Sequence, residues 1–184
     1  MKVRRRSVPL NEIVASRGYR FAPMVVVLGP KMASRRVSGL GDLKEMPIVA
    51  EEGTLADTVL MSYNGGILVD RITHGAPGQP LFDSIERGDI DATLVELHRL
   101  DAYRAQHRDS KISSSGHYHS IGFNLGFIGL ASDAPLVAEV NAAIGDMLAK
   151  QELPALAQAA GLTYLPPRQP DVLTTITRAQ LRGD

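Results

Sequence analysis

The sequence predicts an α/β fold with a parallel sheet, and three observations support that prediction. Between residues 47 and 108, short apolar runs alternate with amphipathic segments in the order strand, helix, strand, helix, strand, helix. Turn-forming Gly, Pro and Asn residues separate these segments. The run at 92–95 is continuously apolar apart from one Thr, which is typical of a parallel strand covered on both faces. This order implies right-handed βαβ units.

The first predicted strand covers residues 21–28, a β-branched apolar run that ends at Gly29-Pro30. A polar connection with a short helix follows over residues 31–44. Residues 47–52 then read as the second strand, because a short apolar run is again bounded by a turn residue, Gly53.

Thr54 marks the start of the next predicted helix, since a Thr hydroxyl can accept a backbone N–H of the first turn. Asp57 stands three residues further on, as a variant of the capping box. We expect this helix to run to about Tyr63, where Asn64-Gly65-Gly66 stops it.

The opening of the third strand is predicted at residues 67–69, and a helix is predicted after the turn at 76–80. Gly88 can adopt the left-handed conformation that closes this helix. The strand at 92–95 follows, with Glu96 at its far end. Because open α/β sheets bind ligands beyond the carboxyl ends of their strands, Glu96 is a candidate site residue.

The remaining chain is predicted as a helix at 99–108, a loop at 109–120 and a Gly-spaced strand at 121–131. A long helix opens at Asp133-Ala134-Pro135. Its apolar side chains follow the helical period at positions 136, 137, 140, 144, 147 and 148. A second helix runs from Pro154 to Gly161, and the tail contains one helical turn at about 175–181.

Composition excludes several classes of function. Twenty basic and twenty acidic residues balance, so the net charge indicates no nucleic-acid partner and no membrane surface. The absence of cysteine excludes disulfides and thiolate chemistry. No run is long enough to insert into a membrane, and the basic start lacks the apolar core of a signal peptide.

Five short motifs, taken in order, resemble one family. They are Leu40-x-Asp42-Leu43, Ile48-Val49-x-x-x-Gly53-Thr54, Gly88-x-Ile90-Asp91-Ala92, Gly126-x-Ile128-x-Leu130-Ala131-x-Asp133-x-Pro135-Leu136 and Val140-Asn141-x-Ala143-Ile144. The sequence is similar to the extracellular solute-binding proteins of family 3, the amino-acid-binding type with a type 2 periplasmic-binding fold. The resemblance covers about residues 21–165.

The resemblance implies two lobes joined by two crossing strands, with the ligand between the lobes. Residues 31–115 would form the second α/β lobe, and residues 1–30 with 116–184 the crossing strands and an incomplete first lobe. Family members build the first lobe mainly from sequence before the first crossing strand, where this chain has few residues. We therefore expect a fragment, a misplaced start or a reduced relative. If the chain is complete, the incomplete first lobe is expected to leave apolar surface on the helix at 134–149.

The same resemblance assigns candidate ligand-binding residues. Thr54, with Gly53 before it, lies where relatives bind a ligand carboxylate through a hydroxyl and helix N-terminal amides, an arrangement that suits an anion. Many relatives carry a second hydroxyl next, where this chain has Leu55. Glu96 lies where relatives present an Asp to a ligand ammonium. A plain helix cap at Thr54 and an exposed strand-end carboxylate at Glu96 are the alternatives.

Two pairs of residues also suggest a metal site as an alternative to ligand binding. Glu96 and His98 would share a strand face, as would His117 and His119. His-x-His in a Ser/Gly-rich loop is more often polar surface, and we predict no metal and no cofactor. The chain also lacks a phosphate-binding loop and the usual hydrolase motifs, so no catalytic residue and no enzyme activity are predicted.

The leading hypothesis is a solute-binding domain that captures a small polar ligand, such as an amino acid, for an ABC permease or a sensor. The alternative is an accessory protein that kept the fold and lost the ligand, like the solute-binding relatives associated with quinoprotein dehydrogenases. The resemblance implies a periplasmic location, although this chain shows no signal peptide. The expected apolar helix face makes a homodimer the further partner hypothesis.

Overall fold

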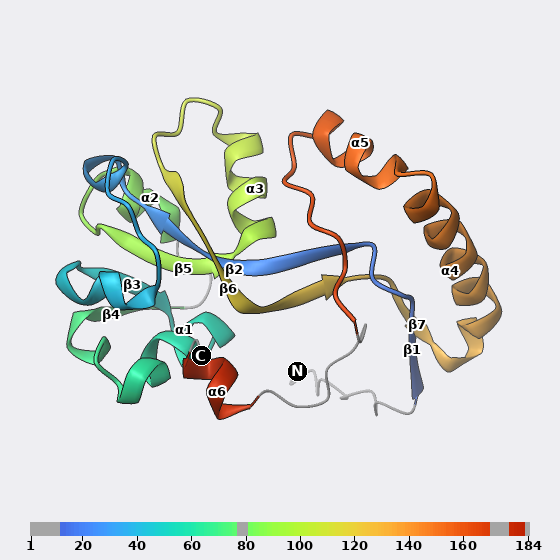
Figure 1. Cartoon of the computed structure of the whole chain (residues 1–184), viewed down its shortest axis with the longest axis horizontal. Helices are drawn as coiled ribbons and strands as arrows, with labels where there is room; N and C mark the ends of the chain where they lie inside the picture. The colour runs from blue at the N-terminus through green and yellow to red at the C-terminus, as the bar shows by residue number, and fades with distance from the viewer. Residues whose placement is uncertain (1–11, 77–80, 170–176, 183–184) are drawn as a thin grey trace, which may run out of the picture. The chain divides into compact units, whose positions relative to one another are not determined.

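The structure, a computed structural model, describes residues 12–76, 81–169 and 177–182 (Figure 1). Its described residues form two compact units, and each is treated by itself. The larger unit contains residues 22–76, 81–123, 161–163 and 177–182; the smaller contains residues 12–21, 124–160 and 164–169. The unit boundaries fall within two strands, between Phe21 and Ala22 and between Phe123 and Asn124. The predicted division into lobes at 30/31 and 115/116 stays a prediction.

The larger unit is built on a sheet with the strand order β4-β3-β5-β2-β6. Its strands are β2 (Arg20–Leu28), β3 (Ile48–Glu51), β4 (Ile72–Gly75), β5 (Ala92–Glu96) and β6 (Ser113–Leu125). β3 is parallel to both β4 and β5, whereas β2 is antiparallel to β5. The parallel βαβ arrangement predicted for residues 47–108 is confirmed.

Helices cover both faces of this sheet, with α2 and α3 on one face and α1 on the other (Figure 1). The larger unit has α1 (Leu55–Ser62), α2 (Leu81–Glu86), α3 (Leu97–Gln106) and α6 (Arg178–Arg182), and a 3₁₀ helix at Leu40–Glu45. These confirm the helices predicted after Thr54, after the 76–80 turn and near residue 40. Residues 77–80 of that turn and 170–176 of the tail lie outside the described residues.

The core of the larger unit explains why its strands lack polar residues. Every residue of β2 is buried, and Val26 and Met24 are fully shielded from solvent. These side chains pack with Leu60 of α1 and Leu43 of the 3₁₀ helix in one apolar cluster. Each such fully buried side chain contributes roughly 1.5–3 kcal/mol. The Val-rich run at 25–27 thus identifies a strand buried on both faces.

The strand predicted to open at residues 67–69 is wrong in position. Val69–Arg71 form a 3₁₀ helix, and β4 begins at Ile72. Leu68 is fully buried as an anchor of the connection, while Ile67 is 47% exposed. The strand itself carries Thr73 and His74, which are polar because this edge strand leaves both side chains exposed.

The loop predicted at 109–120 is wrong from Ser113 onward, where β6 begins. β6 forms the other edge of the sheet, and its Ser- and His-rich first half alternates partly buried with exposed side chains. The predicted strand at 121–131 also ends at Leu125 instead of continuing. At Gly126 the backbone passes close to Ser16, because the Ser16 hydroxyl oxygen accepts the Phe127 N–H. A Cβ at position 126 would lie 3.0 Å from that oxygen.

The smaller unit contains a two-stranded antiparallel sheet, β1 (Ile13–Ala15) with β7 (Ile128–Leu130), and two helices. α4 spans Ala134–Ala149, as predicted, and α5 spans Glu152–Ala159, beginning two residues before the predicted start at Pro154; β1 is not among the predicted strands. Val137 and Ile144 of α4 are buried, whereas Leu136 is 61% exposed. The expected apolar surface on this helix is therefore present at Leu136. None of the described helices is long and apolar enough to span a membrane.

Candidate functional site

The carboxyl ends of β3 and β5 form one edge of the larger unit's sheet. The parallel register pairs Val49 with Thr93, and the Thr93 hydroxyl donates a 2.7 Å hydrogen bond to the Val49 carbonyl oxygen. β3 ends at Glu51 and β5 at Glu96. Two strand-end carboxylates therefore lie on neighbouring strands, where open α/β sheets bind ligands.

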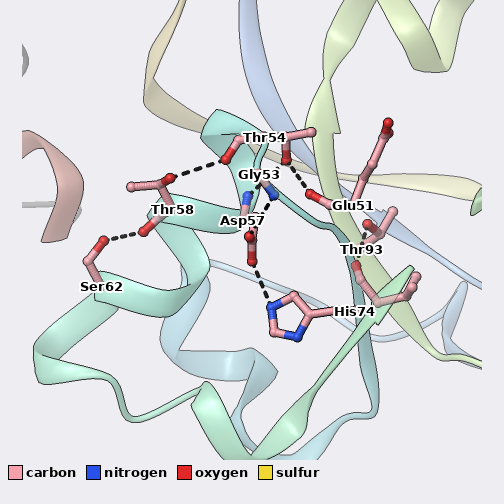
Figure 2. Close-up of polar contacts among 9 residues, drawn as sticks. Glu51, Gly53, Thr54, Asp57, Thr58, Ser62, His74 and Thr93 are labelled. Carbon is pink, nitrogen blue, oxygen red and sulfur yellow. Dashed lines mark hydrogen bonds and ion pairs between the residues drawn. The ribbon is translucent and has the colours of Figure 1, made fainter. Parts of the chain in front are cut away.

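Thr54 lies directly after this edge as the N-cap of α1 (Figure 2). Its hydroxyl oxygen accepts the Asp57 N–H at 3.2 Å and donates to the Glu51 carbonyl oxygen at 2.8 Å. Gly53 makes the turn into the helix with a φ of 76°, a left-handed conformation that favours glycine. The capping role predicted for Thr54 is confirmed, and both functions of its hydroxyl are engaged within the chain.

Asp57 closes the capping box from the other side (Figure 2). Its Oδ2 accepts the Gly53 N–H at 3.1 Å, and its Oδ1 lies 3.0 Å from Nε2 of His74 on β4. The Asp57 side chain is only 14% exposed. A negative charge at a helix N-terminus is favourable, so Asp57 stabilises α1 and links it to β4.

Arg99 of α3 lies between the two strand-end carboxylates. Its Nη2 is 2.7 Å from the Glu51 Oε2, and its Nη1 is 3.7 Å from the Glu96 Oε2. The carboxylate side chains are 16% and 12% exposed, and that of Arg99 is 34% exposed. Arg99 is thus hydrogen-bonded to Glu51 and only electrostatically paired with Glu96.

The structure brings the predicted residues Gly53, Thr54 and Glu96 to the same edge, joined through Glu51 and Arg99. Sequence reasoning missed Glu51, Arg99 and His74. Glu51 could have been found by the strand-end rule that selected Glu96, and Arg99 by its i,i+3 spacing from Glu96. No sequence signal indicates His74, since its contact with Asp57 depends on strand pairing.

Of the two residue pairs considered for a metal site, only one shares a strand as the pattern suggested. His98 lies in α3, because β5 ends at Glu96, so the two do not share a strand face. Among the described residues, no three or more His, Asp or Glu side chains could hold a metal ion together. His117 and His119 do share the extended strand β6.

His119 is 3% exposed, and its Nδ1 accepts the Ile121 N–H at 3.1 Å. This hydrogen bond leaves the proton of the neutral ring on Nε2. Burial, and secondarily the charge of His117, lowers the pKa of His119 below its usual value. His119 is therefore a buried neutral side chain rather than a ligand-facing cation.

No protein-family profile and no curated protein matches the sequence. In contrast, 239 chains of solved structures match. Substrate-binding domain 2 of Lactococcus lactis GlnP, in an open conformation, gives a TM-score of 0.64 at 15% identity, over 82% of this chain and 62% of that one. The unliganded L-cystine solute receptor of Neisseria gonorrhoeae gives 0.60 at 16% identity, over 83% and 62%.

An ancestral arginine-binding protein bound to arginine gives a TM-score of 0.55 at 16% identity, over 80% of this chain and 63% of that one. The chain has the fold of a solute-binding domain. The predicted type 2 periplasmic-binding architecture is confirmed, and this chain spans less than two thirds of the length of these three neighbours. These neighbours are named as a substrate-binding domain, an L-cystine solute receptor and an arginine-binding protein.

Glu96 has an unused hydrogen-bond acceptor at the candidate edge. The Glu96 Oε2 is shielded from solvent and has no hydrogen-bond donor among the described residues. A carboxylate in this state can accept a charge-assisted hydrogen bond from an ammonium group.

Proposed function

We propose that this chain binds a small polar ligand, an amino acid or a similar compound, at the carboxyl edge of β3 and β5. Gly53, Thr54 and Glu96 are the ligand-binding residues proposed at that edge. The observation that carries the proposal is their convergence at one edge of a fold that is shared with proteins named as binders of arginine and of L-cystine. The proposed role is binding rather than catalysis.

Glu96 is the anchor of the proposed site. Its side chain is 12% exposed, and its Oε2 lies 3.7 Å from Arg99, beyond hydrogen-bond distance. A ligand ammonium could therefore bind this oxygen without breaking a hydrogen bond of the chain. Such a ligand would be delivered to an ABC permease or a sensor, and the periplasm is the proposed location.

A thermal-shift screen of amino acids, amines and small carboxylates tests this proposal. A ligand at a hundred times its dissociation constant adds about 2.7 kcal/mol of stability, which gives a readable increase in Tm. Titration calorimetry then measures the affinity for wild type and for Glu96→Gln. No stabilisation by any compound, at concentrations that saturate related binding proteins, would count against a ligand-binding role.

A second function is favoured by the internal contacts of Thr54. Because its hydroxyl both donates and accepts within the chain, the predicted contact with a ligand carboxylate has no free donor at that side chain. This supports an accessory protein that keeps the fold without the ligand. Its partner would be a dehydrogenase, such as a quinoprotein dehydrogenase, or a second copy of this chain. Co-purification with a dehydrogenase, without any small-molecule response, distinguishes this role.

A further inference from the structure

Arg99 has hydrogen-bond donors that the chain leaves unused. A guanidinium carries five N–H donors in a planar fork. Among the described residues, the Arg99 guanidinium makes one hydrogen bond, from its Nη2 to the Glu51 Oε2 at 2.7 Å. Its Nη1 lies 3.7 Å from the Glu96 Oε2, which is beyond hydrogen-bond distance. The side chain is 34% exposed, so its remaining donors are accessible to a ligand.

The hydrogen bond to Glu51 fixes where this guanidinium lies. Glu51 ends β3, and its side chain is 16% exposed. Arg99 belongs to the first turn of α3, which begins directly after β5. The guanidinium therefore lies across the carboxyl ends of two neighbouring strands before any ligand arrives. A donor that is already held in place loses little conformational entropy when it binds a ligand.

Glu96 provides an unused acceptor beside these unused donors. Its Oε2 accepts no hydrogen bond from a described residue, although the Arg99 guanidinium is only 3.7 Å away. A carboxylate and a guanidinium at this separation attract each other but leave hydrogen-bonding groups of both side chains unfilled. The end of β5 therefore presents a cationic donor and an anionic acceptor next to each other.

Arg99 is also a better partner for a ligand carboxylate than Thr54. The Thr54 hydroxyl already donates to the Glu51 carbonyl oxygen at 2.8 Å, so a ligand carboxylate would have to break that bond. A guanidinium fork matches the geometry of a carboxylate and carries a full positive charge. Arg99 can thus receive the carboxylate while the cap of α1 stays intact.

We propose that Arg99 binds the α-carboxylate of the ligand while Glu96 binds its α-ammonium, which makes the site specific for free α-amino acids. This inference rests on the proposed function, because it names the ligand class of the same site. Both charged groups of an α-amino acid are bonded to one carbon, so they need a cation and an anion side by side, as Arg99 and Glu96 are. An amine would use Glu96 alone, and a simple carboxylate would be repelled by it.

A comparison of amino acids with their amides tests the inference, because the amide keeps the α-ammonium and lacks the carboxylate. The standard L-amino acids are titrated into the wild type by calorimetry, and each one that binds is compared with its amide. The titrations are made at about pH 6.5, below the α-amino pKa of roughly 7.7–8.0. We expect the wild type to bind the amino acid at least about tenfold more tightly, since a hydrogen bond to a charged group is lost with the amide.

The substitution Arg99→Met assigns that preference to the guanidinium, because Met keeps most of the apolar stem. It should weaken binding of the amino acid about tenfold and leave binding of the amide within about twofold, so that the preference disappears. A purely structural Arg99 would lower both affinities equally. Arg104→Met is the matched control, since Arg104 lies on the same helix and donates to the Ile112 carbonyl oxygen. It should keep the preference, and circular dichroism verifies that both variants are folded.

Several results would overturn the inference. If the wild type binds an amino acid and its amide equally, or if the preference persists in Arg99→Met, Arg99 is not the carboxylate partner and the proposed ligand-binding function stands. If the wild type binds amines from the thermal-shift screen but no amino acid, the ligand class is wrong and the function again stands. If no compound of any class binds, the proposed function fails and the inference fails with it. The comparison in the wild type holds whether or not a variant folds.

Discussion

Arg99 offers the sharpest test of how the candidate edge is held together. The substitution Arg99→Met keeps most of the apolar stem but removes the guanidinium between Glu51 and Glu96. A hydrogen bond to a charged group contributes roughly 1.5–3 kcal/mol. Arg99 is 34% exposed, so solvent screening reduces this to about 1 kcal/mol for its bond with Glu51.

A double-mutant cycle separates the two partners of Arg99. Urea denaturation followed by far-UV circular dichroism gives the free energy of unfolding for Arg99→Met, Glu51→Gln, Glu96→Gln and the two double mutants. We expect a coupling of about 1 kcal/mol between Arg99 and Glu51, whose atoms are 2.7 Å apart. The coupling with Glu96 should be below about 0.5 kcal/mol, because no hydrogen bond spans 3.7 Å.

Arg87 and Asp89 provide a control pair on the same unit. Their side chains are 62% and 58% exposed at a distance of 2.9 Å, so their coupling should not be measurable. A coupling for Glu96 as large as that for Glu51 would refute the argument. It would mean that Arg99 binds Glu96 directly in solution, and that Glu96 is not free to anchor a ligand.

Three further outcomes are expected. Thr54→Ala should lower the unfolding free energy by about 1 kcal/mol in urea denaturation, whereas Thr54→Ser should retain it, because only the hydroxyl caps α1. His119 has a lowered pKa, so the unfolded chain takes up its proton first and stability should fall as the pH drops below 6.5. His119→Asn, which keeps an acceptor for Ile121, should flatten that pH dependence. The exposed Ile128 and Leu136 should produce a dimer in light scattering after size-exclusion chromatography, and a monomer at all concentrations would contradict this.

The fold was predictable wherever burial fixes the sequence pattern. Residues 25–27 and 92–95 lie in central strands covered on both faces, and such strands must be apolar. The edge strands β4 and β6 were misplaced, because most of their side chains are exposed or only partly buried, so polar residues are tolerated there and no apolar run marks the strand. β1 has only three residues and pairs with β7, which is distant in sequence, so no local pattern reveals it.

The sequence predicts which edge of the sheet carries the candidate site, but not which hydrogen bonds and ion pairs its residues form. The motif around Gly53 and Thr54 and the end of the strand at Glu96 identify one edge of the sheet. Spacing cannot tell that Arg99 prefers Glu51 or that His74 reaches Asp57, because each contact joins a helix to a strand that is distant in sequence and meets it only in the folded unit. The sequence therefore does not determine which side chains pair with one another at this edge.

The hydrogen bonds within the chain also determine which of the predicted site residues a ligand can contact without breaking an existing bond. A ligand carboxylate that accepts from the Thr54 hydroxyl must break its hydrogen bond to the Glu51 carbonyl oxygen, which contributes about 1 kcal/mol, and so loses about fivefold in affinity. A ligand ammonium at Glu96 breaks none. We therefore expect Glu96→Gln to weaken binding of an ammonium ligand found in the thermal-shift screen by at least about tenfold in calorimetry, because a charge-assisted bond is lost, while Thr54→Ala leaves it within about twofold. An equal loss in both variants would show that ligand binding rearranges the cap of α1.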